Sequence, residues 1–136
     1  MAFHYSEPKD LEIEANAILD MARNLEAEVT CRSLKDRGHK VFCPDWDGDK
    51  RARIASRKTE LLDAATECLG RCEEAVRLHR KAFERNEYAI DVDPAWTDPH
   101  RRGLQAHALA AAERAAFAAR TAVDFMMCIP DDMISD

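Results

Sequence analysis

Apolar residues recur every three or four positions along three long stretches of this chain, which is the spacing of one face of an α-helix. The first stretch predicts a helix over residues 8–37, with a cap at Ser6 or Glu7 and an exit at Gly38. Its apolar face is formed by Leu11, Ala15, Ile18, Ala22, Leu25 and Val29.

The second stretch predicts a helix over residues 50–88. Large apolar residues recur there at every seventh position, at Leu62, Leu69, Val76 and Phe83. Between them lie Ala65, Cys72 and His79, and the stripe is broadened by Leu61, Cys68, Ala75 and Ala82. A seam of this width is typical of a helix that packs in a bundle.

The third stretch predicts a helix over residues 99–128, capped by Thr97 or Asp98 and with Pro99 in its first turn. It carries two apolar stripes. One consists of Leu104, Ala108, Ala111, Ala115, Ala118, Ala122, Phe125 and Ile129; the other consists of Leu109, Ala112, Ala116, Ala119, Val123 and Met126. Polar side chains are confined to a narrow strip around Glu113, Arg120 and Asp124.

These patterns predict an all-α fold, in which residues 1–136 form one domain of three long antiparallel helices in an up-down-up bundle. The linkers are residues 38–49 and 89–98. Because the third helix is apolar over most of its circumference, we expect a homodimer about a two-fold axis to complete the bundle. The alternative is that this helix is the best-buried member of a monomer. The expected self-association residues are Leu109, Ala112, Ala116, Phe117 and Val123.

Composition narrows the classes of function. The chain has 136 residues, a formal net charge of -6, and 46% hydrophobic residues, which allow it to form a core. An acidic chain disfavours sequence-independent binding of nucleic acid. The start of the sequence lacks the pattern of a secretory leader, and we interpret the five cysteines as reduced thiols. We therefore expect a cytoplasmic protein. Arg120 and Asp124 interrupt the most apolar stretch, which argues against a membrane span.

The loop before the second helix contains three alternating aspartates, Asp45, Asp47 and Asp49, as a calcium-binding EF-hand loop does. However, Lys50 stands where that loop needs glycine, and Ser56 stands where it needs a bidentate glutamate. Helix capping by Asp47 or Asp49 is the better interpretation.

Five cations follow this loop, and we call Lys50, Arg51, Arg53, Arg57 and Lys58 the basic patch. Cations at a helix start oppose the helix dipole. They are therefore solvated or paired within the chain, for example with the acidic first helix, or they meet an acidic partner, nucleic acid or phosphate. The predicted partner-binding residues are Trp46, Arg51, Arg53, Arg57 and Lys58.

The string Phe42-Cys43-Pro44-Asp45-Trp46-Asp47 resembles one in short reading frames of phage origin. The resemblance covers six residues; it implies an origin in a mobile element and assigns no activity. Trp46 and Trp96 both lie in linkers, where each either closes one end of the core or anchors a partner.

Metal chemistry has two candidate sets. Cys68, Cys72 and His79 are either core residues or zinc ligands, with Cys31 and Cys43 able to complete a site. The carboxylate pairs Glu60/Asp63 and Glu84/Glu87 have the spacing seen in helical nucleotide hydrolases. They lie roughly 30 Å apart on one helix and could share metals only across a dimer.

The sequence thus predicts a non-enzymatic, cytosolic protein-interaction module, an adaptor or inhibitor that binds another protein sterically, with no cofactor. Nucleic-acid or nucleotide binding through the basic patch is one alternative, and a metal-dependent helical-bundle hydrolase is another.

Overall fold

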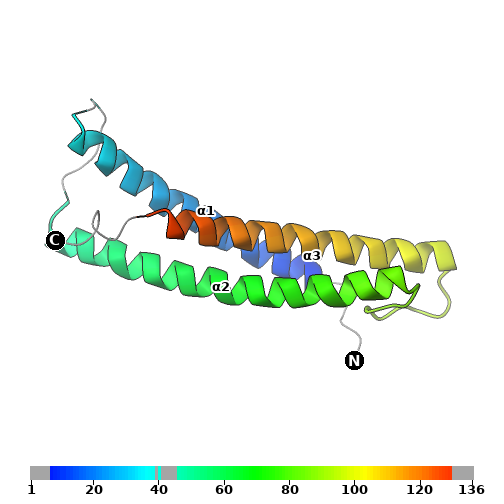
Figure 1. Cartoon of the computed structure of the whole chain (residues 1–136). Coiled ribbons are helices and arrows are strands. Elements are labelled where there is room, and N and C mark those ends of the chain that lie inside the picture. The colour runs from blue at the N-terminus through cyan, green and yellow to red at the C-terminus, as the bar shows by residue number, and fades with distance from the viewer. Residues whose placement is uncertain (1–6, 39, 41–45, 130–136) are drawn as a thin grey trace.

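The computed structural model describes residues 7–38, 40 and 46–129. This part of the chain forms three helices: α1 over Glu7–Asp36, α2 over Gly48–Glu84 and α3 over Asp98–Met127. Successive helices run in opposite directions along an elongated bundle (Figure 1). The predicted all-α, up-down-up architecture is confirmed, and the predicted dimer stays a prediction.

Local capping sets where α2 and α3 begin, as predicted, whereas the predicted cap residue Ser6 lies outside the described residues. Asp47 Oδ1 accepts a hydrogen bond from the backbone N–H of Lys50 at 2.7 Å and so caps α2. The Thr97 hydroxyl oxygen accepts one from the N–H of His100 at 3.3 Å and caps α3. At the exit of α1, Gly38 has a φ of 87°, a conformation that glycine adopts without strain.

Helix α2 ends earlier than predicted, at Glu84 instead of residue 88. Asn86 adopts a φ of 56°, in the left-handed region that asparagine tolerates better than most residues. The next N–H, that of Glu87, donates to the carbonyl of Ala82 at 2.8 Å, which closes the last turn.

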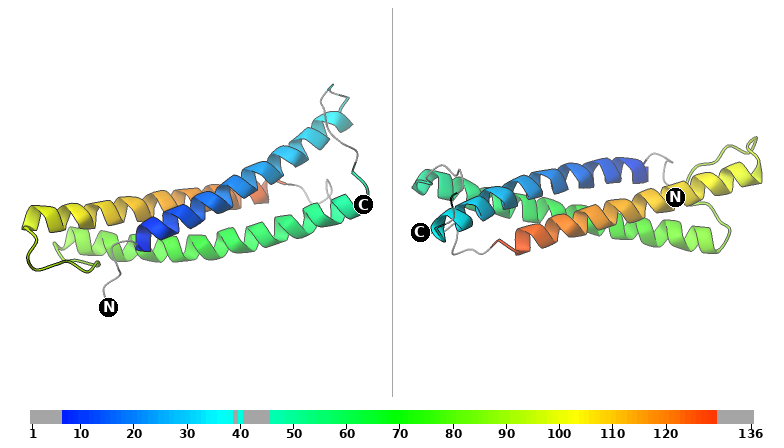
Figure 2. Two further views of the ribbon diagram at one scale, coloured as in Figure 1. Left: turned by 180° about the vertical axis from the view of Figure 1, so that it is seen from behind. Right: turned by 90° about the horizontal axis from the view of Figure 1, so that it is seen from above.

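Helix α3 contacts α1 and α2 more extensively than these two contact each other. Figure 2 shows α1 diverging from α2 toward the end at which α3 finishes. Small side chains on α3 let both neighbours approach its backbone closely. Its buried residues are Gln105, Ala108, Ala111, Ala112, Ala115, Ala118, Ala119, Ala122 and Met126.

The packed face of α2 is rotated relative to the predicted seam of large residues. Leu62, Leu69 and Val76 are only half-buried, and Phe83 is 48% exposed. The buried residues are Ile54, Leu61, Ala65, Cys68, Cys72, Ala75, His79 and Ala82. Because α3 presents alanines, the small residues of α2 face it and the larger ones lie at the edges of the contact.

Charged residues tie α1 to both neighbours. Arg114 of α3 contacts Glu12 of α1 at 2.5 Å, and Arg71 of α2 donates to Glu14 of α1 at 3.0 Å. These hydrogen bonds lower the pKa of both carboxyl groups against the opposing effect of burial. In the described part of the chain, no helix is both long and apolar enough to cross a membrane.

Candidate functional site

Two lysines of the basic patch are engaged by the chain itself. Lys50 Nζ lies 3.2 Å from a carboxylate oxygen of Glu28 on α1. Lys58 Nζ donates to the backbone carbonyl of Ile129, just beyond α3, at 2.6 Å. These contacts fit the internally paired interpretation, in which the acidic first helix balances part of the charge.

Two arginines of the patch, Arg53 and Arg57, are exposed, whereas Arg51 is half-buried and lies over Trp46. Trp46 is half-buried against the core, so it helps to close this end of the bundle. The Arg51 guanidinium lies 5.9 Å from its ring centroid. Arg57 donates to Met21 Sδ at 3.2 Å, and Arg53 is exposed one turn before it.

The two tryptophans occupy different environments. Trp96 is 37% exposed and meets His100 edge to face, with ring centroids 5.1 Å apart. It therefore does not fill the core at its end of the bundle. Ile90, only 2% exposed, is the residue of that linker that does, and its apolar position within a polar linker was the available sequence signal.

Cys68 and Cys72 are core residues. Both are fully buried, and their sulfur atoms lie 3.9 Å apart. Burial raises the pKa of both thiols, that of Cys72 to about 12, whereas a zinc ligand or nucleophile is a thiolate. Among their proposed co-ligands, Cys31 is half-buried on α1, and Cys43 lies outside the described residues.

His79 is a buried histidine bonded to a neighbouring helix, as predicted. Its Nδ1 lies 3.0 Å from Nε2 of Gln105 on α3. The Gln105 carbonyl oxygen accepts from the N–H of Ala89 at 2.8 Å, which fixes the amide orientation. Nδ1 must therefore accept, so the ring is neutral. Burial lowers the pKa of His79, partly opposed by Glu7.

The carboxylates of the hydrolase alternative are not brought together. Glu60 lies 4.0 Å from Arg57, while Glu84 lies at the other end of the same helix. Over residues 7–38, 40 and 46–129, no group of three or more histidine, cysteine, aspartate or glutamate side chains has a metal-binding arrangement.

The five predicted self-association residues of α3 differ in how deeply they are buried. Ala112 is fully buried within one chain and is not available at a surface, because it faces the other helices. Leu109, Ala116 and Val123 are half-buried. Phe117 alone of the five predicted self-association residues is mainly exposed, at 74%.

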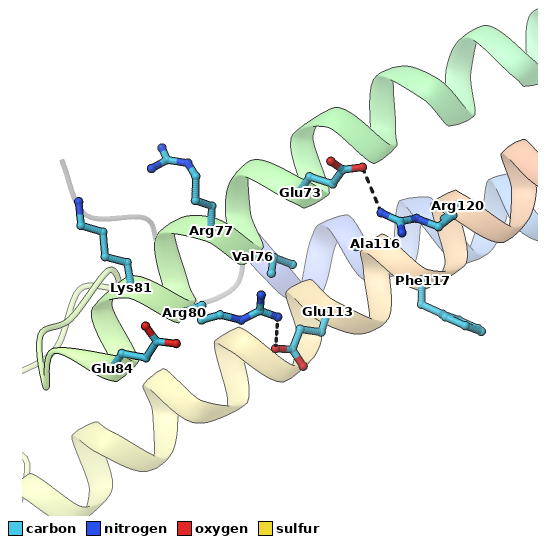
Figure 3. Close-up of a pocket in the computed structure, with 10 residues that line it drawn as sticks. All are labelled: Glu73, Val76, Arg77, Arg80, Lys81, Glu84, Glu113, Ala116, Phe117 and Arg120. Atoms are coloured by element: carbon cyan, nitrogen blue, oxygen red, sulfur yellow. Dashed lines mark hydrogen bonds and ion pairs between the residues drawn. The ribbon is translucent and has the colours of Figure 1, made fainter.

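A groove of about 710 Å³ lies between α2 and α3 beside Phe117 (Figure 3). Val76 and Ala116 contribute its apolar surface, and its rim carries four basic and three acidic side chains. Two ion pairs cross it: Arg80 to Glu113 at 3.1 Å, and Arg120 to Glu73 at 3.4 Å.

The ring of Phe117 projects outward from α3, away from α2 (Figure 3). It is the most exposed of the large apolar side chains in the described part of the chain. We call Phe117, the groove and the two ion pairs that cross it the Phe117 face. The sequence predicted Phe117 as a self-association residue but did not predict the groove. The residues that line the groove depend on how α2 and α3 are aligned along each other, which the sequence does not show.

Comparison with protein-family models, curated proteins and solved structures finds no match to this chain.

Proposed function

We propose that this chain is a non-enzymatic protein-interaction module, an adaptor or inhibitor, that binds a macromolecular partner sterically through the Phe117 face. The observation that carries the proposal is the 74% exposure of Phe117 within the 30-residue helix α3. Exposed aromatic side chains beside a groove are typical anchors of protein interfaces, because they bury much area and lose little conformational freedom.

Two further features support the proposal. The side chains best suited to catalysis, Cys68, Cys72 and His79, serve the core. Cys68, Cys72 and Cys128 form no disulfide within the described part of the chain, which fits the cytoplasm. An origin in a mobile element, suggested by the residue 42–47 string, would make a host-directed inhibitor the natural subtype.

Covalent capture tests this function. A photo-crosslinking phenylalanine analogue replaces Phe117 in one version of the full chain and Ile13 in a control version. Ile13 is 62% exposed on α1, so it matches Phe117 in exposure while lying on another helix. The proposal predicts a specific crosslinked protein from position 117 alone. Absence of a product at 117, or equal products at both positions, would contradict it.

Nucleic-acid binding through the basic patch is the second candidate, because Arg53 and Arg57 are both exposed on adjacent turns of α2. This candidate predicts that a labelled oligonucleotide binds, that salt weakens binding steeply, and that reversing Arg51, Arg53 and Arg57 to glutamate abolishes it. The main proposal predicts no such binding at physiological salt.

A further inference from the structure

The two ion pairs across the α2–α3 groove have opposite polarity. At one level α2 contributes the anion Glu73, which meets the cation Arg120 of α3. At the other level α2 contributes the cation Arg80, which meets the anion Glu113 of α3. The two levels are seven positions apart on each helix, or about 10 Å. Charge therefore alternates both along and across the groove (Figure 3).

The four charges form a square in which positive and negative side chains alternate. A two-fold axis lying in the plane of this surface brings a second copy face to face with the first, and opposite charges then meet. If the axis crosses the groove midway between the two levels, Glu73 faces the second copy's Arg80. Glu113 then faces the second copy's Arg120. If the axis runs along the groove, Glu73 faces the second copy's Arg120 instead. Opposite charges meet in both arrangements.

The apolar side chains of the face lie at the level between the two ion pairs, with Phe117 on the side of α3 that faces away from α2. Val76 of α2 and Phe117 of α3 are both at the middle level, between the two ion pairs. With the axis that crosses the groove, α3 of the second copy lies over this α3, so the two Phe117 rings meet on the same side of the contact. The charged pairs then lie beside this apolar contact, and polar groups at the edge of an apolar contact are usual in a protein interface.

We infer that the occupant of the Phe117 face is a second copy of this chain, packed about a two-fold axis at the level of Phe117. This inference rests on the proposed function and narrows it: the partner bound through the Phe117 face is a second copy, so an adaptor or inhibitor role falls to the two-copy assembly. A rim of nearly balanced charge offers little attraction to a polyanion such as nucleic acid, whereas it matches itself.

The test uses two charge variants of the full chain. In the acidic-face variant, Arg80→Glu and Arg120→Glu leave only anions at the four positions. In the basic-face variant, Glu73→Arg and Glu113→Arg leave only cations. The four side chains are between 47% and 62% exposed, so we expect both variants to keep the helical circular dichroism of the native chain.

Sedimentation equilibrium over a range of concentrations then reports copy number. We expect the native chain to sediment as two copies, and each variant alone to associate at least about tenfold more weakly, because like charges face each other. An equimolar mixture of the two variants should restore a two-copy species. Native mass spectrometry with one variant isotopically labelled should find one copy of each.

Two results would overturn the inference: a native chain that sediments as one copy at every concentration, or variants that associate alone as the native chain does. If either variant fails to fold, the single substitution Phe117→Ser keeps the test decisive, since it must also abolish the two-copy species. If position 117 crosslinks to a different protein and the native chain is a single copy, this inference fails and the proposed function stands.

Discussion

The two faces of α3 differ sharply, although they belong to one helix. The inner face is built from alanines and ends in Met126, which is fully buried, with Gln105 as its buried polar residue. The outer face carries Phe117 and Met127, which are 74% and 67% exposed. The inner face determines how the helices fit together. The outer face does not contribute to this packing. We explain its large exposed apolar side chains by the proposed docking of a second copy.

Neighbouring methionines give the largest contrast between the faces. Met126→Ala should lower the free energy of unfolding by about 2–5 kcal/mol, because it leaves a cavity in the core. Met127→Ala, one position further along, should change it by less than about 0.5 kcal/mol. Urea unfolding followed by circular dichroism measures both. Equal losses would contradict the assignment of the two faces.

The buried polar contact of the inner face should matter less than Met126. Gln105→Leu removes the amide that His79 and the N–H of Ala89 both contact, and it should cost about 1–3 kcal/mol of unfolding free energy. The same urea experiment measures it, with His107→Leu on the exposed side of α3 as the control. A loss no larger than that of the control would show that the network does not stabilise the fold.

The neutral state of His79 predicts a pH dependence. Its pKa is lowered from the usual 6.5, so the unfolded chain takes up a proton at a higher pH than the folded chain. The stabilising contribution is complete above pH 6.5 and is lost as the pH falls through the folded-state pKa. Unfolding free energies measured between pH 7.5 and 5.5 should show a decrease in the native chain that the His79→Leu variant lacks.

The outer face should have the smallest effect on stability. Phe117→Ser should change the unfolding free energy by less than about 0.5 kcal/mol, and Ile13→Ser should behave alike, since both side chains are largely exposed. Sedimentation separates them: only the Phe117 variant should lose association. A destabilisation of several kcal/mol by Phe117→Ser would mean that this side chain serves the fold of one chain.

Local signals in the sequence predicted the three helices and the caps at which α2 and α3 begin. Periodicity located all three helices, and the caps at Asp47 and Thr97 follow from the preference of aspartate and threonine for that position. His79 was predictable as a buried hydrogen-bonded residue from its place in the seam. Its partner Gln105 was not, because a lone glutamine in a helix gives no sign of burial.

The remaining differences come from packing between helices. The seven-residue repeat ending at Phe83 suggested a seam of large residues, but the alanines of α3 receive the small residues of α2 instead. Periodicity gives the apolar stripe of a helix, and the partner helix decides which edge of the stripe is covered. The groove escaped prediction for the same reason, since Glu73 and Arg120 meet only in one antiparallel register.

The central claim is that Phe117 is open in a single chain and covered by another chain. Hydroxyl-radical labelling followed by mass spectrometry measures the accessibility of individual phenylalanine rings. In the native chain, the labelling rate of Phe117 should exceed that of Phe83 at high dilution and fall as the concentration rises, while the rate of Phe83 stays constant. A Phe117 rate that does not change with concentration, or that is below that of Phe83 even at high dilution, would contradict the account.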